Sequence, residues 1–385
     1  MSNKSIPKLR FPEFTGEWEQ RKLENVTEEF KSGSFIAAND IEENGEYPVY
    51  GGNGLRGYAS TYNHDGEFAL IGRQGALCGN MNYYVGKAYF TEHAVAVKAN
   101  NASNTKFLYY LLDKMNLGQY SDQSAQPGLA VGKLIKLENM FPSKQEQEKI
   151  GTYFKYLDNL ITLHQRKCNS LKELRDGIIQ RILSRELRFK RTDGSEFENW
   201  VTKELSEIFT ERKVSQTITE DAPLLSFTIE QGVINPQDKK TNKRDFLIKD
   251  KDTKKFALTE VDDIIYNPAN LKYGAIHRNK LMRGVVSPIY AIFYTEQNPA
   301  FMEYVVKNPT FIKNSLKYLE GTVIKLMTLK PKDFLKLKVE IPASLEEQKI
   351  IADFLMQFDE TIDAEQRRIE KWKELKKGLI QQMFI

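Results

Sequence analysis

Lys-Glu-Leu-Arg-Asp-Gly-Ile-Ile-Gln stands at residues 172–180, and Lys-Glu-Leu-Lys-Lys-Gly-Leu-Ile-Gln stands at residues 373–381. Both stretches belong to a gapless internal repeat, in which residues 146–183 align with residues 347–384 at an offset of 201 and 13 of the 38 pairs are identical. A repeat of this length indicates a duplicated chain. We therefore expect two equivalent halves, each made of a variable region followed by a long repeat.

Each copy of the repeat has the pattern of a coiled-coil helix. Apolar residues recur at alternating steps of four and three, which is a heptad seam sustained over about five heptads. Pro142 and Pro342 mark the two beginnings. Two helices from one duplicated chain are expected to pack antiparallel around a pseudo-twofold axis. The residues assigned to this helix pair or to a partner that binds it are Leu157, Ile161, Leu174, Ile178, Phe358, Ile362, Trp372 and Leu379.

His164 and Glu365 occupy matching seam positions near the middle of the two repeats. A single polar layer in an apolar seam fixes the register of the helices. We expect these two side chains to form that layer. A shorter echo precedes each half, because Leu9-Arg10-Phe11 returns at residues 187–189 and Trp18 returns as Trp200.

The regions between the repeats predict many short strands and few helices, so the expected fold class is mixed α/β. Two globular α/β domains would be separated by the two long helices. The expected bounds are 1–142 for the first domain, 143–184 for the first helix, 185–342 for the second domain and 343–385 for the second helix. Strands are expected at 47–50, 67–72, 93–98, 224–230, 263–266 and 285–294, and helices at 106–115 and 299–318.

Composition narrows the class of protein. The 385 residues are 41% hydrophobic and 28% charged, which is typical of folded domains, and the length favours more than one of them. The net charge of +4 implies no basic tail. Cys78 and Cys168 are too few for a disulfide framework and favour a reducing compartment. With no apolar run of membrane-spanning length and no signal-peptide core, a cytoplasmic protein is expected.

Catalytic motifs are all incomplete in this sequence. The glycine-rich stretch at 51–57 has no Lys-Ser/Thr of a phosphate-binding loop, so turns in a β-rich domain are the better interpretation. Asn267-Pro268-Ala269-Asn270 resembles the loop with which adenine methyltransferases grip a flipped base, but lacks its second proline and its aromatic residue. The four histidines show no metal-ligand spacing. The sequence predicts no catalytic residue, no metal and no cofactor on this chain.

Basic residues gather in the second half. Residues 239–255 hold eight cationic side chains against three acidic ones, and residues 307–338 hold eight lysines against two acidic residues. Such clusters neutralise phosphates without reading bases. Loop donors and amides could read base edges. The candidate DNA-binding residues are Arg56, Arg73, Gln74, Lys249, Lys251, Lys254, Lys255, Lys272, His277 and Arg278.

Both variable regions carry short sequence motifs besides the repeat. The first variable region carries Tyr-Pro-Val-Tyr-Gly-Gly-Asn-Gly (47–54), Ile-Gly-Arg-Gln-Gly (71–75) and Gln-Pro-Gly-Leu (126–129). The second carries Leu-Ser-Phe-Thr-Ile-Glu-Gln-Gly-Val (225–233), Tyr-Asn-Pro-Ala-Asn-Leu-Lys-Tyr-Gly-Ala-Ile (266–276) and Val-Ser-Pro-Ile-Tyr (286–290). With these motifs and the duplicated layout, the chain resembles, over nearly its whole length, the specificity (S) subunit of type I restriction–modification systems.

The resemblance implies a non-catalytic DNA-recognition subunit. Each variable region would be a target recognition domain that reads one half of a split, asymmetric sequence. The long helices would fix the distance between the half-sites and dock two methyltransferase (M) subunits. Those subunits would bind S-adenosylmethionine and methylate adenine, and ATP-driven motor–endonuclease (R) subunits, with Mg2+, would complete the complex.

Two other functions are compatible with parts of the sequence. Asn267-Pro268 leaves open a self-contained adenine DNA methyltransferase, which would bind S-adenosylmethionine without partners. The heptad repeats alone would also suit a coiled-coil scaffold with two protein-binding heads and no role on DNA. The resemblance favours the specificity subunit over both.

Overall fold

The computed structural model describes residues 5–121, 127–239, 254–318 and 328–385. The chain divides into two compact units, one of residues 1–168 with 365–385 and one of residues 169–364. Two long helices, α3 (Lys144–Leu183) and α7 (Leu345–Met383), each contribute one part to either unit. The described residues contain no helix that is both long and apolar enough to cross a membrane.

The first unit is built on a six-stranded sheet with strand order β2-β7-β5-β6-β3-β4. All neighbouring strands are antiparallel except β3 and β6, which are parallel. The strands are β2 (Thr27–Ser32), β3 (Tyr47–Gly51), β4 (Gly54–Ala59), β5 (His64–Gly72), β6 (Met81–Phe90) and β7 (Ala94–Ala99). A separate pair is formed by β1 (Glu19–Lys22) and β8 (Glu138–Phe141), and the helices are α1 (Thr105–Lys114) and α2 (Val131–Leu134).

The core of the first unit joins this sheet to the helices. Ala69, Ile71, Val95 and Val97 on the sheet belong to one buried cluster with apolar residues of α1, the start of α3 and the end of α7. Helix α1 begins at Asn104, whose side-chain oxygen accepts a hydrogen bond of 3.0 Å from the Phe107 amide.

The second unit distributes its strands over smaller sheets. The four-stranded sheet has the order β10-β18-β15-β16, and β11-β14-β17 and β12-β13 form two further sheets. The strands are β10 (Phe209–Glu211), β11 (Ser215–Gln216), β12 (Ser226–Thr228), β13 (Gly232–Ile234), β14 (Phe256–Thr259), β15 (Ile264–Tyr266), β16 (Ile276–Arg278), β17 (Gly284–Val286) and β18 (Ala291–Thr295). The remaining elements are β9 (Val201–Glu204), its partner β19 (Lys338–Ile341), α4 (Pro299–Lys307), α5 (Pro309–Ser315) and α6 (Pro331–Phe334).

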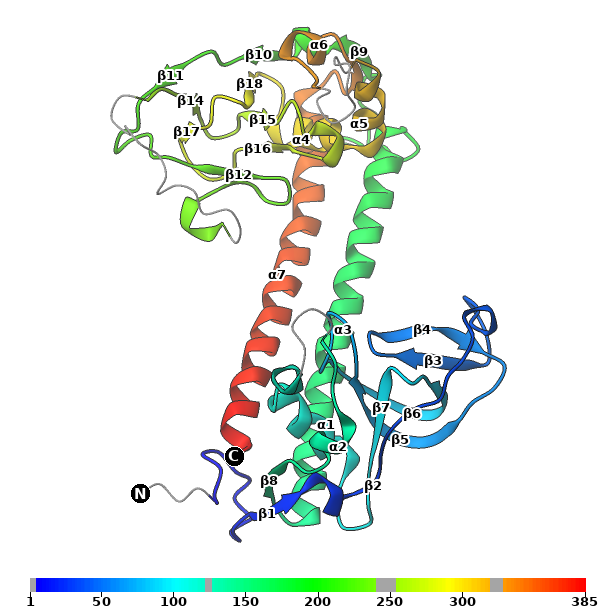
Figure 1. The fold of residues 1–385 in the computed structure, drawn as a ribbon. Helices are drawn as coiled ribbons and strands as arrows, with labels where there is room; N and C mark the ends of the chain where they lie inside the picture. The colour runs from blue at the N-terminus through cyan, green and yellow to red at the C-terminus, as the bar shows by residue number, and fades with distance from the viewer. Residues whose placement is uncertain (1–4, 122–126, 240–253, 319–327) are drawn as a thin grey trace. The chain divides into compact units, whose positions relative to one another are not determined.

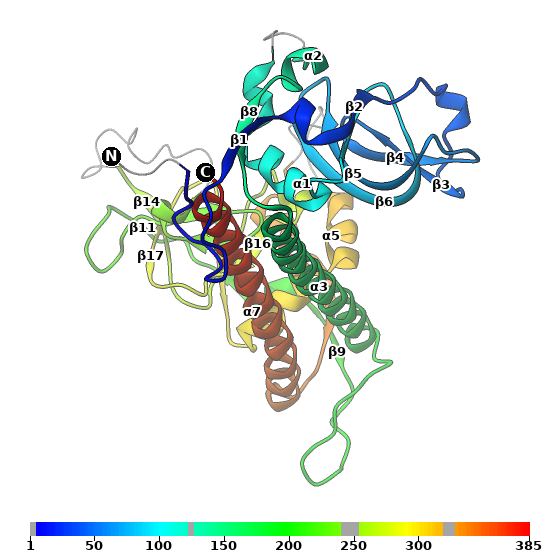
Figure 2. The ribbon, with the colours of Figure 1, turned by 90° about the horizontal axis from the view of Figure 1, so that it is seen from below.

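The long helices run antiparallel within each unit (Figures 1 and 2). In the first unit, Asp158 pairs with Lys376 while His164, further along α3, pairs with Glu365, which comes earlier on α7. In the second unit, Arg175 pairs with Asp359, and Ile182 shares a buried cluster with Ile351. The antiparallel packing predicted from the duplication is confirmed in each unit.

The predicted polar layer is also present. His164 Nδ1 lies 2.9 Å from Glu365 Oε2, and Lys167 Nζ donates to Glu365 Oε1 over 2.7 Å. The Lys167 hydrogen bond is the main reason why the pKa of Glu365 is lowered. A charged carboxylate among His164, Lys167 and Arg368 therefore occupies this layer of the seam.

Several strand and helix predictions need correction. Residues 285–294 were predicted as one strand but form β17 and β18, which belong to different sheets. Ser287 and Pro288 interrupt the run, because proline has no amide to donate and Tyr290 N turns back to Ser287 O over 3.2 Å. The strand predicted at 224–230 is limited to β12. The ten-residue β6 was missed, since its buried positions do not alternate.

Candidate nucleic-acid interface and helix contacts

Three predicted DNA-binding residues of the first unit lie on or beside two loops that approach each other at the edge of the sheet formed by the ends of β3 and β5. Arg73 and Gln74 follow β5, and Arg56 lies on β4. The Arg73 amide donates to His93 O over 2.9 Å, which joins the loop after β5 to the turn before β7. A Cβ at Gly52 would lie 3.4 Å from Gln74 O and 3.1 Å from His93 O, so the β3–β4 turn approaches the same loop. The fold thus gathers loops that are far apart in sequence.

The side chains at this edge retain hydrogen-bonding capacity. Arg56 and Gln74 are exposed. Arg73 is half-buried and makes one side-chain hydrogen bond, from Nη1 to Ser32 Oγ over 3.3 Å, while its buried Nε has no partner among the described residues. Oε2 of Glu92, next to His93, is likewise buried without a partner among them. Guanidinium donors and carboxylate acceptors are the groups that distinguish base pairs in the major groove.

The β3–β4 turn requires glycine at position 51, because the Arg56 side chain packs closely against the backbone there. A Cβ on Gly51 would lie 2.6 Å from Arg56 Cδ, and Gly54 adopts a φ of +96° in the turn between β3 and β4. The stretch therefore contains the turn of the β3–β4 hairpin, which agrees with the expected turns in a β-rich domain, and the next element is the strand β5. Its glycines allow the Arg56 side chain to cross the backbone closely.

The predicted residues of the second unit are more dispersed. Lys254 and Lys255 are exposed at the start of β14, with Lys254 Nζ 5.5 Å from the centroid of the Phe256 ring. Lys272 Nζ lies 5.0 Å from the centroid of the exposed Tyr273 ring. Lys249 and Lys251 lie outside the described residues, as does most of the basic segment 239–255.

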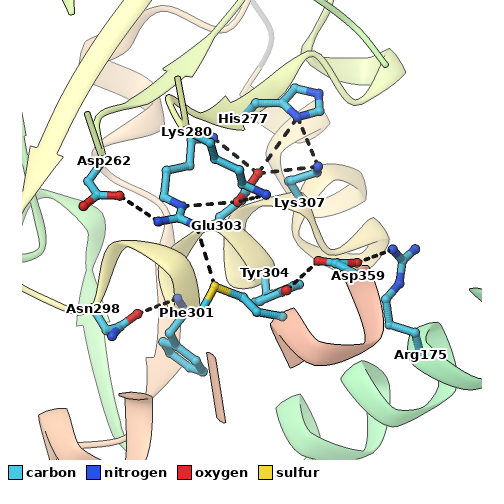
Figure 3. Close-up of polar contacts among 12 residues, drawn as sticks. Arg175, Asp262, His277, Lys280, Asn298, Phe301, Glu303, Tyr304, Lys307 and Asp359 are labelled. Carbon is cyan, nitrogen blue, oxygen red and sulfur yellow. Dashed lines mark hydrogen bonds and ion pairs between the residues drawn. The ribbon is translucent and has the colours of Figure 1, made fainter. Parts of the chain in front are cut away.

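His277 and Arg278 lie next to each other on β16 but face inward to other side chains (Figure 3). The buried His277 ring places Nε2 2.7 Å from Ile229 O, so Nε2 carries the hydrogen and donates to that carbonyl. Arg278 Nη1 donates to Asp262 Oδ1 over 2.7 Å. These contacts engage Nε2 of His277 and Nη1 of Arg278 within the protein.

The Asn267-Pro268-Ala269-Asn270 stretch forms a local turn. The Asn267 side chain accepts a hydrogen bond of 3.0 Å from the Ala269 amide, and Pro268 O accepts one of 3.0 Å from Leu329 N. The amide group of Asn267 is thereby engaged with its own loop, in the manner common for asparagine in turns. The described residues also contain no cluster of three His, Cys, Asp or Glu side chains that could hold a metal ion.

Seven of the eight helix residues predicted as seam or partner contacts are at least half-buried, with Leu157 and Ile362 buried almost completely. Leu174 is the exception, because its side chain is 54% exposed. It stands on the outer side of α3, while Leu171 and Ile178 hold the seam positions around it.

Both units attach their variable regions to the helices through the same buried carboxylate. In the first unit, Glu146 accepts two hydrogen bonds of 2.7 Å from Arg10 and one of 3.4 Å from Trp18 Nε1. In the second unit, Glu347 accepts hydrogen bonds of 3.2 Å from Arg188 and from Trp200 Nε1. The short echoes in the sequence are therefore the partners of an identical repeat residue.

A glutamine and an aspartate repeat the pattern. Gln147 binds Pro142 O and the Asn104 amide, and Gln348 binds Pro342 O and the Asn298 amide, all within 2.9–3.1 Å.

Further along each helix, an aspartate is the centre of a triad of polar side chains that the sequence did not predict. The first triad is Tyr110, Asp158 and Lys376, and the second triad is Tyr304, Asp359 and Arg175.

The two triads have the same geometry. Each tyrosine hydroxyl donates to one aspartate oxygen over 2.6 Å, and the cation donates to the other oxygen, over 2.5 Å from Lys376 and 2.7 Å from Arg175. Burial and the hydrogen bond to the aspartate raise the pKa of both tyrosines. The identity of Asp158 and Asp359 in the repeat was the available signal, but the tyrosines come from regions that do not align by sequence.

The fold and these contacts define a duplicated mixed α/β protein, with two different sheet regions attached by one repeated set of helix contacts. The sequence model of a protein family, the type I restriction modification DNA specificity domain, matches residues 15–173 and 288–374 of this chain. The chain belongs to that family.

Individual relatives agree with this assignment. The EcoprrI specificity subunit of Escherichia coli is 44% identical over 179 residues, which are 45% of this chain and 44% of that protein. The MjaX specificity subunit of Methanocaldococcus jannaschii is 25% identical over 328 residues, 78% of this chain and 73% of that protein. The chain thus spans less than half the length of the EcoprrI subunit. A crystal structure of the S subunit from M. genitalium has the same fold, with a TM-score of 0.68 at 16% identity over 99% of both chains.

Proposed function

We propose that this protein is the DNA-recognition subunit of a type I restriction–modification complex. Its two variable regions, 1–142 and 185–342, are target recognition domains that each read one half of a bipartite asymmetric site. The helices at 143–184 and 343–385 fix the distance between the half-sites and carry two methyltransferase subunits. Those partners supply S-adenosylmethionine chemistry, and motor–endonuclease subunits supply ATP-driven, Mg2+-dependent cleavage.

The observation that carries this proposal is a constant attachment that bears two different sheet regions. Glu146, Gln147 and Asp158 make the same contacts in the first unit as Glu347, Gln348 and Asp359 make in the second. Apart from the two-stranded pairs β1–β8 and β9–β19, the described residues of the first region form one six-stranded sheet, whereas those of the second form three smaller sheets. Different surfaces on equivalent attachments suit the reading of two unlike half-sites.

The edge of the first sheet is the part of this surface best suited to base contacts. Arg56, Arg73 and Gln74 gather there, and Arg73 retains an unsatisfied buried donor among the described residues. Lys249, Lys251, Lys254, Lys255 and Lys272 supply phosphate contacts in the second domain. His277 and Arg278 support that surface from inside, because their polar atoms are bound to Ile229 and Asp262.

The proposal is tested by mapping methylated adenines in a host that carries this chain with its methyltransferase partner. A bipartite, asymmetric methylated sequence is expected, and it should disappear when this chain is omitted. The purified chain alone should show no methyl transfer. Methylation by the isolated chain, or a methylated sequence that does not depend on the chain, would contradict the proposal.

Replacing Lys249, Lys251, Lys254 and Lys255 by glutamine should weaken binding to all duplexes and leave the preferred sequence unchanged. Lysines that bind phosphates release counterions, so every phosphate that is no longer neutralised should lower the log–log slope of affinity against salt by roughly 0.9. Fluorescence anisotropy over a salt series measures this slope. Glutamine at the exposed Lys371, on α7, serves as a control. An unchanged slope in the quadruple variant would place this cluster away from DNA.

A further inference from the structure

Each unit contains a hollow beside its polar triad, and the two hollows are built from repeat-related residues. The first hollow has a volume of about 530 Å³ and the second about 490 Å³. Asp158, Ile161 and Ile380 line the first, and their repeat partners Asp359, Ile362 and Ile179 line the second. The internal duplication therefore reproduces a concave site as well as a pair of helices.

The correspondence extends beyond the long helices. Helices α1 and α4 begin at Asn104 and Asn298 and supply the triad tyrosines, which sets their register at an offset of 194 residues. In that register, Asp113 and Lys114 of the first hollow correspond to Lys307 and Asn308 of the second. The walls of both hollows thus share three elements, namely α3, α7 and the helix that carries the tyrosine. The second hollow is lined in addition by residues near β12, β16 and α5.

The two hollows have opposite charge. Four lysines, Lys114, Lys373, Lys376 and Lys377, line the first hollow together with Asp113 and Asp158. The second hollow has three cationic side chains, which are Arg175, Lys280 and Lys307, and five carboxylates. His277 adds no charge at neutral pH, because burial, reinforced by Lys307, lowers its pKa to about 4. The first hollow is net positive and the second is net negative.

Glu303 pairs with the cationic side chains on the inner wall of the second hollow (Figure 3). Its side chain is 3% exposed and lies 3.0 Å from Lys280 Nζ and 3.7 Å from Lys307 Nζ. Lys307 Nζ in turn lies 3.1 Å from His277 Nδ1, to which it donates. Lys280 and Lys307 are therefore already paired, Asp176 pairs with Arg175 over 2.8 Å, and the exposed Asp363 adds to the net negative charge of the hollow.

The pKa shifts of Asp113 and Lys307, which occupy matching places on α1 and α4, add to the contrast in charge between the two hollows. Burial raises the pKa of Asp113 in the first hollow and lowers the pKa of Lys307 at the matching place in the second. Each shift disfavours the charged form, which is a carboxylate in the first hollow and an ammonium group in the second. Burial also lowers the pKa of Lys114, which opposes the trend in the first hollow.

We propose that the two hollows are the docking points of two copies of one partner, the methyltransferase subunit, and that their opposite charge makes the two copies bind with unequal affinity. This inference rests on the proposed function. A protein surface can bind the side chains that both hollows share, namely the isoleucines and the glutamine at Gln381 or Gln180. The surrounding charge then modulates the affinity of that surface for each hollow. A small charged ligand that suited one hollow would be repelled by the other.

Asp176 and Lys377 allow a symmetrical test. They are repeat partners, both are exposed, and each follows directly after the cation of its triad. Asp176→Lys removes the negative excess of the second hollow, and Lys377→Asp removes the positive excess of the first. Whatever the charge of the partner surface, the double variant D176K/K377D should bring the two hollows to the same net charge.

The experiment titrates the purified methyltransferase subunit onto the full chain and measures both dissociation constants by native mass spectrometry over a salt series. We expect two unequal constants that converge as salt rises, because exposed charges are screened. Each single substitution should shift the affinity of its own site by about threefold to tenfold, in opposite directions for the two sites. The double variant should bind the two copies with nearly equal affinity.

Glu173→Lys together with Glu374→Lys is the matched control. Both are exposed, identical repeat residues, so this pair changes both halves alike and should leave the gap between the two constants in place. Equal, salt-independent affinities in the unchanged protein, or a gap that survives in D176K/K377D, would overturn the inference. A methyltransferase that does not bind the chain at all would instead contradict the proposed function.

Discussion

Exchanging residues 7–142 for the corresponding region of a relative with a different target should replace one half of the methylated sequence completely and leave the other half unchanged. The physical reason is that a repeated set of polar contacts, beside a shared apolar core, holds this region on the repeat helices. Arg10 and Trp18 bind Glu146, the Asn104 amide binds Gln147, and Tyr110 binds Asp158. A region that carries these groups at matching places should attach in the same way.

The measurement is methylome sequencing of cells that express the chimaera with its methyltransferase partner. A reciprocal exchange of residues 185–342 should change the opposite half of the site. As a control for attachment, the same chimaera with the equivalent of Tyr110 replaced by phenylalanine should keep the new half-site while losing stability. A change in both halves after exchange of one region would refute the assignment of one domain to one half-site.

Glu146→Ala should lower the free energy of unfolding of the first unit by about 3–5 kcal/mol, the cost of leaving a buried charge without its partner. The Glu146 side chain is 1% exposed and that of Arg10 is 12% exposed, so water cannot fully replace the missing acceptor. Glu347→Ala should have the corresponding effect in the second unit, where Arg188 and Trp200 lose the same acceptor.

Hydrogen–deuterium exchange during denaturant titration distinguishes the units. Glu146→Ala should increase exchange in α1 and the start of α3 and leave α4 unaffected. The exposed Glu148, two residues away, supplies the control, since its substitution by alanine should cost less than about 0.5 kcal/mol. The double variant Arg10→Ala/Glu146→Ala should recover part of the stability, because it buries no unpaired charge. A double variant as unstable as the sum of both single variants would show that the pair is not coupled.

The repeat determined most of what could be predicted. A heptad period and an offset of 201 are local properties of the chain, so the two helices, their antiparallel contacts in each unit and the His164–Glu365 layer could be predicted. The strand predictions succeeded where burial gave a continuous apolar run, as in Phe68–Ile71 of β5. They failed in β6 and in 285–294, where partners distant in the sequence decide which residues pair.

The candidate site residues were predicted less completely, for a related reason. In the sequence, Arg56, Arg73 and Gln74 are separate loop donors. Only the close packing at Gly51 and Gly52 brings their loops to one edge of the sheet. The residue type alone makes His277 a candidate for DNA binding. In the fold, its ring is buried against its neighbours Ile229, Lys307 and Glu303. The residue type indicates what a side chain can donate, but the surrounding chain decides to which group it donates.

The sequence by itself determined that this protein is a duplicated chain with two long amphipathic helices and the motifs of a DNA specificity subunit, because periodicity and repetition are readable along one dimension. The tertiary structure alone decided how each half is attached and how the halves differ. Tyr110 and Tyr304 align with nothing in the repeat, yet each donates to the repeat-related aspartate of its own unit, Asp158 or Asp359. The opposite charges of the two hollows arise likewise, since side chains from elements far apart in the sequence share one small volume only after the chain has folded.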